Sequence, residues 1–216
     1  MRGVTVDWGP RDNAAVVPVM TICDHTDEQC IGSGAGAGRL DLSVGEYRLV
    51  RKPRQKGAAM CWQCDNPHRT TDEYLDELRT TIRDHGWAVQ FVESDQRPLA
   101  YTIGLHDKGL PELLVTGMHA QTATKLLNVI GHQMVDEGMV LQPAVHIDCG
   151  GRFLLEVVEV EHPDVHLKFA VGLQGSNICA FQLVWADDAG RWPWDRRWSH
   201  GRRSQPVLGV RSPLPE

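Results

Sequence analysis

The chain has 216 residues, of which 42% are hydrophobic and 23% charged, a composition typical of a globular protein with one main domain. Its formal net charge of -6 disfavours binding to duplex nucleic acid or to an anionic membrane surface, because both attract basic proteins. No apolar run reaches the roughly 18 residues that a membrane span needs. The composition therefore predicts a soluble, cytoplasmic protein and leaves its activity open.

The first 59 residues differ in character from the rest of the chain. Residues 1–60 hold 8 basic and 7 acidic side chains, whereas the remainder holds 14 and 21, so the negative charge lies in the second part. The run from Gly32 to Gly38 alternates glycine with small residues, which is typical of a linker. We therefore expect residues 1–59 to be a largely unstructured extension, or the product of a mis-set translation start, and residues 60–216 to form a single domain.

From residue 60 onward, the spacing of apolar residues predicts an α+β fold. Thr70 and Glu73 form a capping-box signature for a helix over about residues 71–85, which Gly86 ends. A second amphipathic helix is predicted over residues 119–137. Strands are predicted at residues 87–92, 99–105, 113–115, 144–147, 153–160, 165–171 and 178–185. This order favours a mainly antiparallel sheet with two principal helices packed on one face.

Several ordered motifs carry a family resemblance. They are His85-Gly86-Trp87-Ala88-Val89-Gln90, Ala100-Tyr101-Thr102-Ile103-Gly104-Leu105, Pro111-Glu112-Leu113-Leu114-Val115-Thr116-Gly117, Gln182-Leu183-Val184-Trp185-Ala186-Asp187, Gly190-Arg191-Trp192-Pro193-Trp194-Asp195 and Gln205-Pro206-Val207-Leu208-Gly209. In this order they resemble the bacterial family catalogued as domain of unknown function 4262. The resemblance covers about residues 61–210 and implies domain limits and a shared site, but no known activity.

The cysteines suggest a metal site. Cys61-x-x-Cys64, with His68 close behind, has spacing compatible with part of a zinc site. No fourth ligand lies nearby, so it would have to come from the extension or through the fold; the candidates are Cys23, His25, Cys30, Cys149, Cys179 or a distant histidine. The alternative is that the two cysteines are small residues packed at the chain entry. Cys179 lies in a predicted strand and Cys149 just after one, and both are expected to be buried.

The stretch from Trp185 to Arg203 is the most unusual in composition. It holds four of the seven tryptophans, interleaved with arginines and opposed by few acidic residues: Trp185, Trp192, Trp194 and Trp198, with Arg191, Arg196, Arg197, Arg202 and Arg203, against Asp187, Asp188 and Asp195. Indole rings and guanidinium groups stack on bases and hold carboxylate or phosphorylated ligands. The alternative is a long loop that its tryptophans pin to the body of the domain.

A second candidate region is the strand end at Tyr101, Thr102 and Gly104, where a glycine permits close backbone approach. A packing requirement would explain Gly104 equally well. If this strand and the tryptophan-rich stretch share one edge of the sheet, Tyr101, Trp185 and Trp194 line a common pocket.

Three functional hypotheses follow. The favoured one is a ligand- or protein-binding regulatory domain, with these binding residues: Tyr101, Thr102, Gly104, Trp185, Asp187, Trp194 and Arg196. The alternative is a zinc-dependent enzyme or zinc-stabilised domain that uses Cys61, Cys64 and His68. The second alternative is single-stranded nucleic-acid binding. The sequence specifies no reaction, ligand or oligomeric state, and zinc is the one cofactor that it suggests.

Overall fold

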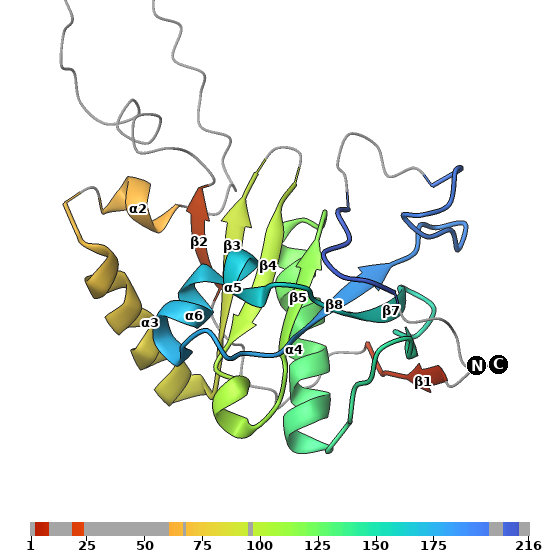
Figure 1. Cartoon of the computed structure of the whole chain (residues 1–216), viewed down its shortest axis with the longest axis horizontal. Coiled ribbons are helices and arrows are strands. Elements are labelled where there is room, and N and C mark those ends of the chain that lie inside the picture. Colours follow the sequence, from red (N-terminus) through yellow and green to blue (C-terminus); the bar gives the residue numbers. More distant parts are fainter. Residues whose placement is uncertain are drawn as a thin grey trace, which may run out of the picture.

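The centre of the fold is a mixed eight-stranded sheet. The computed structural model describes residues 3–8, 19–23, 61–66, 68–94, 97–198 and 205–211. The strands are β1 (Gly3–Thr5), β2 (Val19–Cys23), β3 (Ala88–Glu93), β4 (Leu99–Ile103), β5 (Glu112–Thr116), β6 (His146–Asp148), β7 (Leu154–Glu159) and β8 (Ala180–Trp185). Their order across the sheet is β1-β6-β7-β8-β5-β4-β3-β2 (Figure 1).

The predicted α+β class and the mainly antiparallel pairing are confirmed for the part of the sheet formed by β3 to β8. Four of its five pairings are antiparallel, and only β5 and β8 run in parallel. The two outer strands also pair in parallel, β1 with β6 and β2 with β3, which makes the whole sheet mixed.

Both outer strands come from the segment that the sequence marks as an extension. Val6, just after β1, is fully buried, and its N–H donates to the carbonyl oxygen of Asp148 at 2.8 Å. At the opposite edge, Met20 and Ile22 of β2 pack against the core. Residues 9–18 and 24–59 of the expected extension, including the Gly32–Gly38 run, lie outside the described residues. The domain boundary at residue 60 stays a prediction.

The helices are α2 (Trp62–Asp65), α3 (Thr71–His85), α4 (Ala120–Asp136), α5 (Pro163–His166) and α6 (Lys168–Gln174), with a short 3-10 helix η1 (His106–Lys108). The predicted capping box is confirmed at the start of α3. The Thr70 hydroxyl accepts the N–H of Glu73 at 3.3 Å, and the Glu73 carboxylate accepts the N–H of Thr70 at 2.7 Å. Gly86 ends the helix with a φ of 92°, a left-handed conformation that glycine adopts without a side-chain clash.

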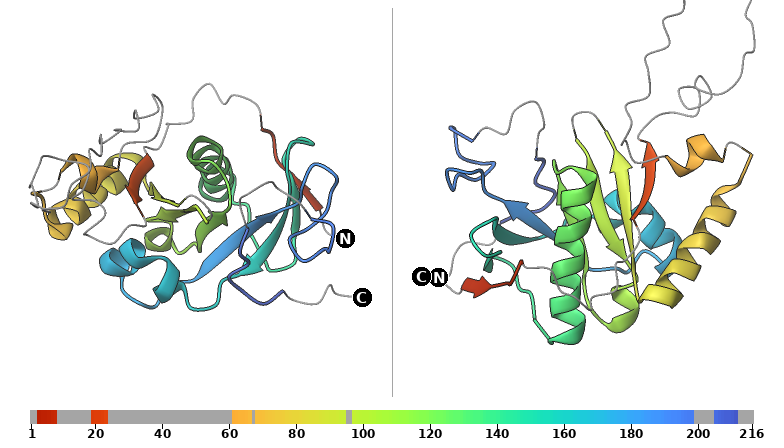
Figure 2. Two further views of the ribbon diagram at one scale, coloured as in Figure 1. Left: turned by 90° about the horizontal axis from the view of Figure 1, so that it is seen from above. Right: turned by 180° about the vertical axis from the view of Figure 1, so that it is seen from behind.

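The helices cover both faces of the sheet, so the expectation of helices on one face is wrong. In Figure 2, α4 stands in front of the sheet in the right panel, whereas α5 and α6 lie in front in Figure 1. Alternate side chains of a strand point to opposite faces, so β3 buries Val89 in the core under α4 and Ala88 in the core under α3 and α6. Each face therefore has its own apolar core.

The strand predicted at residues 165–171 is also wrong, because α5 and α6 occupy this segment. Pro163 is the first residue of α5, where its missing N–H costs nothing. Leu167 and Ala170 are three residues apart, and both are fully buried, which is helical spacing. A short apolar run does not distinguish strand from helix, and here packing against α3 decides it.

Candidate functional site

The tryptophan–arginine loop, defined here as residues 186–198, begins where β8 ends. Asp187 organises its first turn. One carboxylate oxygen accepts the backbone N–H groups of Ala189 and Arg191, both at 2.9 Å, and the other accepts the Arg191 guanidinium at 2.8 Å. Burial raises the pKa of the Asp187 carboxyl, but the hydrogen bonds from Arg191 and Ala189 lower that pKa by more, so it lies below its usual value. Asp187 therefore shapes the loop as an ionised side chain.

A stacked column of four side chains forms the centre of this region. Trp192 and Trp194 stack with ring centroids 5.3 Å apart and an interplanar angle of 11°. His146, from β6, stacks on Trp192 at 5.4 Å. The guanidinium of Arg211 lies 3.7 Å from the centroid of the Trp194 ring, a cation–π contact. Pro193 thus sits in an ordered turn that places its two neighbours side by side.

One buried carboxylate holds both ends of the stacked column. The Glu156 side chain, on β7, is 1% exposed and accepts two hydrogen bonds from Arg211, at 2.7 and 3.0 Å. It also lies 3.2 Å from the imidazole of His146. Sequence reasoning missed Glu156 and Arg211, because nothing local to either residue points to the tryptophans, which lie far away along the chain.

Trp185 belongs to the core rather than to the exposed loop. It is 3% exposed, and its indole N–H donates to the carbonyl oxygen of Thr116 at 2.9 Å. The Gln205 side chain accepts the backbone N–H of Trp185 at 2.8 Å and donates to its carbonyl oxygen at 2.9 Å. This pairing fixes the C-terminal strap, defined as residues 205–211, across the end of β8.

Gln182 holds the middle of the strap in the same way. Its amide donates to the carbonyl oxygen of Pro206 at 2.8 Å, and it accepts the N–H of Leu208 at 2.7 Å. The strap ends at Arg211 on the stacked column. Three buried side chains therefore determine where the tryptophan pair lies: Glu156 on β7, Gln182 on β8 and Gln205 in the strap.

A hollow of about 430 Å³ lies beside the loop, between the turn before β7 and the end of β8. We call it the β7–β8 hollow. Its lining residues are Gly151, Arg152, Phe153, Leu154, Trp185, Ala186, Asp187, Asp188 and Gly190. Trp185 and Asp187 line this hollow, whereas Trp194 and Arg196 do not. Arg196 is exposed on the loop. Arg202 and Arg203, the last two arginines of the stretch noted in the sequence, lie outside the described residues.

Tyr101 is buried on the other face of the sheet. Its side chain packs in the core under α3 and α6, and its hydroxyl accepts the N–H of Phe169 at 3.4 Å. Burial raises its pKa. Trp185 packs in the core under α4. The two residues therefore do not line a common pocket, and Tyr101 is placed as a core residue.

Thr102 and Gly104 lie around a buried carboxylate that sequence reasoning also missed. Glu112 is fully buried and accepts the Thr102 hydroxyl at 2.6 Å, the Gly104 N–H at 2.8 Å and the His106 N–H at 3.1 Å. Burial raises the pKa of Glu112, and these hydrogen bonds offset only part of that rise. The carboxylate ties the end of β4 to the start of β5, which is a structural task.

Packing explains Gly104. Its φ is 117°, and a Cβ at this position would lie 3.0 Å from the Ile82 side chain and 3.1 Å from the Cα of Trp87. A larger residue would have to displace both. The expectation that this glycine makes room for a ligand gains no support from its surroundings.

The described side chains supply no further ligand that would complete the predicted zinc site with Cys61 and His68. Cys61 is buried at the start of α2, and His68 is exposed. Within the described residues, no three His, Cys, Asp or Glu side chains are grouped as a metal site requires. The side chain of Cys64, and all of His25 and Cys30, lie outside the described residues.

The two remaining cysteines differ from each other. Cys149 is buried as predicted, and burial raises the pKa of its thiol to about 12. Cys179 precedes β8 and is exposed, so the prediction of a buried residue is wrong there.

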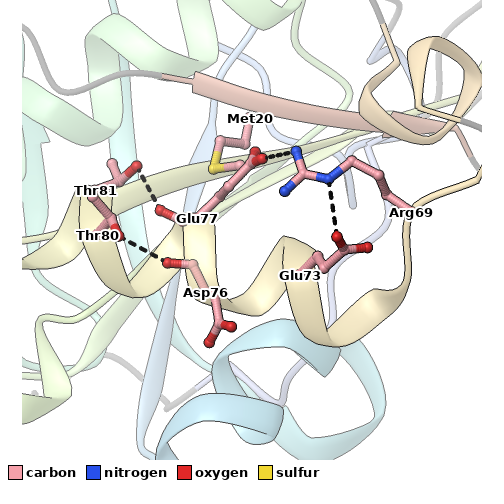
Figure 3. Close-up of a pocket in the computed structure, with 7 residues that line it drawn as sticks. All are labelled: Met20, Arg69, Glu73, Asp76, Glu77, Thr80 and Thr81. Carbon is pink, nitrogen blue, oxygen red and sulfur yellow. Dashed lines mark hydrogen bonds and ion pairs between the residues drawn. The ribbon is translucent and has the colours of Figure 1, made fainter.

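A second hollow, of about 470 Å³, lies between α3 and Met20 of β2. Figure 3 shows Arg69 reaching between Glu73 and Glu77, with which it forms ion pairs. The hydroxyls of Thr80 and Thr81 donate to carbonyl oxygens within α3, each at 3.0 Å. The charged groups of Arg69, Glu73 and Glu77 pair with one another, and the two threonine hydroxyls bond to α3 itself, so these lining groups already have partners.

Residues 81–199 match a family model described as Domain of unknown function (DUF4262), which is more than half of the chain. The chain belongs to the DUF4262 family. The matched range lies inside the resemblance noted at residues 61–210 and includes β3 to β8, the β7–β8 hollow and the tryptophan–arginine loop. The DUF4262 match leaves out β1, β2 and the strap.

Searches of curated proteins and of solved structures gave no match. In the described part of the chain, no helix combines the length and the apolar character that crossing a membrane requires.

Proposed function

We propose that this chain is a binding domain that docks a partner protein on the tryptophan–arginine loop. The observation that carries the proposal is the stacked pair of Trp192 and Trp194, both only half-buried, next to the exposed Arg196 and Arg197. Tryptophan and arginine are the residues most enriched among those that dominate protein interfaces.

The rigidity of the loop supports the same proposal. Asp187 and Asp195 each accept a backbone N–H within the loop, and Glu156 anchors the column on which the tryptophans stack. A loop that is already ordered loses little conformational entropy when a partner binds, so more of the contact energy remains as affinity.

Single-stranded nucleic acid is a weaker fit to this geometry. Bases bind to free aromatic faces. Here Trp192 contacts both His146 and Trp194, and Trp194 contacts both Trp192 and Arg211. Asp188 and Asp195 are also exposed on the loop and would repel phosphates.

The test is affinity capture from an extract of the source organism, with the full chain as bait. Arg196→Ala with Arg197→Ala should reduce recovery of a specific partner about tenfold or more. Arg79→Ala with Arg83→Ala removes the same charge from exposed positions on α3 and should leave recovery unchanged. The proposal fails if the loop variant captures the partner as well as the wild-type chain does. Loss of capture after nuclease treatment would instead support nucleic-acid binding.

A further inference from the structure

The β7–β8 hollow carries two charged side chains of opposite sign that have no ionic partner within the described residues. Arg152 is exposed, and its guanidinium lies 5.8 Å from the Trp8 ring and 5.9 Å from the Phe153 ring. Among the described residues, it forms no ion pair. The contacts that the described residues make with this guanidinium come from aromatic rings, which leave the donors of its edge available.

Asp188 supplies the opposite charge. It is exposed, and no side chain or backbone N–H in the described segments hydrogen-bonds to its carboxylate. The neighbouring aspartate differs completely, because Asp187 already accepts three hydrogen bonds within the loop. The loop therefore uses one carboxylate for its own structure and presents the next to the hollow.

The lining of the hollow also includes apolar surface. Leu154 is 39% exposed and is one of the large apolar side chains that the described residues expose to solvent. Phe153 and Trp185 line the hollow with it. The backbone N–H of Ala186 donates to the carbonyl oxygen of Leu154 at 2.9 Å, so this apolar floor is held by the pairing of β7 with the end of β8.

We propose that the β7–β8 hollow binds a small zwitterion of the amino-acid or short-peptide class. Arg152 holds the ligand carboxylate, because a guanidinium matches a carboxylate with two parallel hydrogen bonds. Asp188 holds the ligand ammonium group, and the ligand side chain lies over Leu154. A volume of about 430 Å³ falls within the range of small-molecule sites.

The experiment titrates the full chain with leucine and with leucyl-leucine, followed by calorimetry and by tryptophan fluorescence, since Trp185 lines the hollow. At least one of the two ligands should bind saturably. Acetylating its amino group, or amidating its carboxylate, should each weaken binding about tenfold, the effect of one charged hydrogen-bonded contact. This comparison uses the wild-type chain alone and needs no variant to fold.

Two variants then assign the charges. In Arg152→Gln the penalty for amidation should disappear while the penalty for acetylation remains, and Asp188→Asn should show the converse. Arg97→Gln and Asp107→Asn remove exposed charges elsewhere on the surface and should bind as the wild-type chain does. The proposal is overturned if neither ligand binds below about 10 mM, or if both penalties survive in both variants.

This inference stands apart from the proposed partner protein. Arg196→Ala with Arg197→Ala leaves the lining of the hollow intact and should bind the zwitterion normally. Failure of partner capture and failure of ligand binding therefore appear in different variants.

Discussion

Arg211 and Glu156 are 55 positions apart in sequence and form a two-point ion pair, with nitrogen to oxygen distances of 2.7 and 3.0 Å. Glu156 is buried in the sheet, whereas Arg211 is 37% exposed and lies over the Trp194 ring. The contact therefore joins the strap, β7 and the tryptophan–arginine loop at one point. A domain that presents Trp194 to a partner needs such a connection, because the loop itself is not part of the sheet.

Arg211→Ala should destabilise the chain by about 2 kcal/mol, because it leaves Glu156 buried with His146 as its remaining side-chain partner among the described residues. Urea unfolding followed by tryptophan fluorescence measures the loss. Arg79→Ala removes an exposed ion pair with Asp76 and should cost less than about 1 kcal/mol. If both variants lose the same free energy of unfolding, the contact between Arg211 and Glu156 stabilises the chain no more than an exposed ion pair does.

Glu112→Gln should change how stability depends on pH. The pKa of Glu112 is raised in the folded chain, so wild-type folding favours the protonated form and the free energy of unfolding falls as pH rises above about 4.3, the unfolded value. Glutamine does not titrate; its carbonyl oxygen can accept the Gly104 N–H, and its amide N–H can donate to the Thr102 hydroxyl oxygen. The variant should therefore gain stability relative to wild type from pH 4 upward, until the folded pKa is passed.

Urea unfolding at intervals between pH 4 and pH 8 tests this difference. Glu161→Gln, which replaces an exposed carboxylate by the same amide, is the matched control. If the Glu112→Gln curve runs parallel to the wild-type curve, the buried carboxyl is not the source of the pH dependence.

Gly104→Ala should destabilise the chain by about 2 to 3 kcal/mol, because the new Cβ meets both Ile82 and the Trp87 backbone. Gly109→Ala is the control. Its φ of 73° is also left-handed, but a Cβ there has no neighbour within 4 Å, so it should cost only the backbone strain of about 1 kcal/mol. Thermal or urea unfolding of both variants separates crowding from strain. A smaller loss at Gly104 than at Gly109 would contradict the packing explanation.

Asp187→Asn should loosen the tryptophan–arginine loop, because asparagine cannot form the ion pair with Arg191. Hydrogen exchange should become faster at the backbone amides of residues 189–198. Asp188→Asn, one residue along, removes a carboxylate without a partner in the described segments and should leave exchange unchanged. Exchange that is equally fast in both variants would show that charge alone, rather than the Asp187 contacts, orders the loop.

Comparing Asp187→Asn with the wild-type chain should also reveal a pH dependence of stability, opposite in sign to that of Glu112. The pKa of Asp187 is lowered in the folded chain, so its stabilising contribution is present above the unfolded value and is lost as pH falls through the folded pKa. The stability difference between wild type and Asp187→Asn should therefore shrink below about pH 4. A difference that is constant down to pH 2 would contradict this.

The sequence by itself determined the features that depend on neighbouring residues. The capping box of Thr70 and Glu73, the stop at Gly86 and the two neighbouring strands β3 and β4 each lie within one helix end or one hairpin, so local chemistry is sufficient to predict them. The concentration of tryptophan and arginine after β8 is likewise visible without a structure.

Only the tertiary structure decided which of these residues meet. Tyr101 and Trp185 lie on opposite faces of the sheet, and His146, Glu156 and Arg211 converge on the tryptophan pair from β6, β7 and the strap. These contacts depend on the order of the strands and on the face of the sheet to which each side chain points. Both are set by pairings between segments far apart in sequence, such as β5 with β8. A helix at residues 168–174 replaced a predicted strand for the same reason, because burial against α3, not local preference, determined its form.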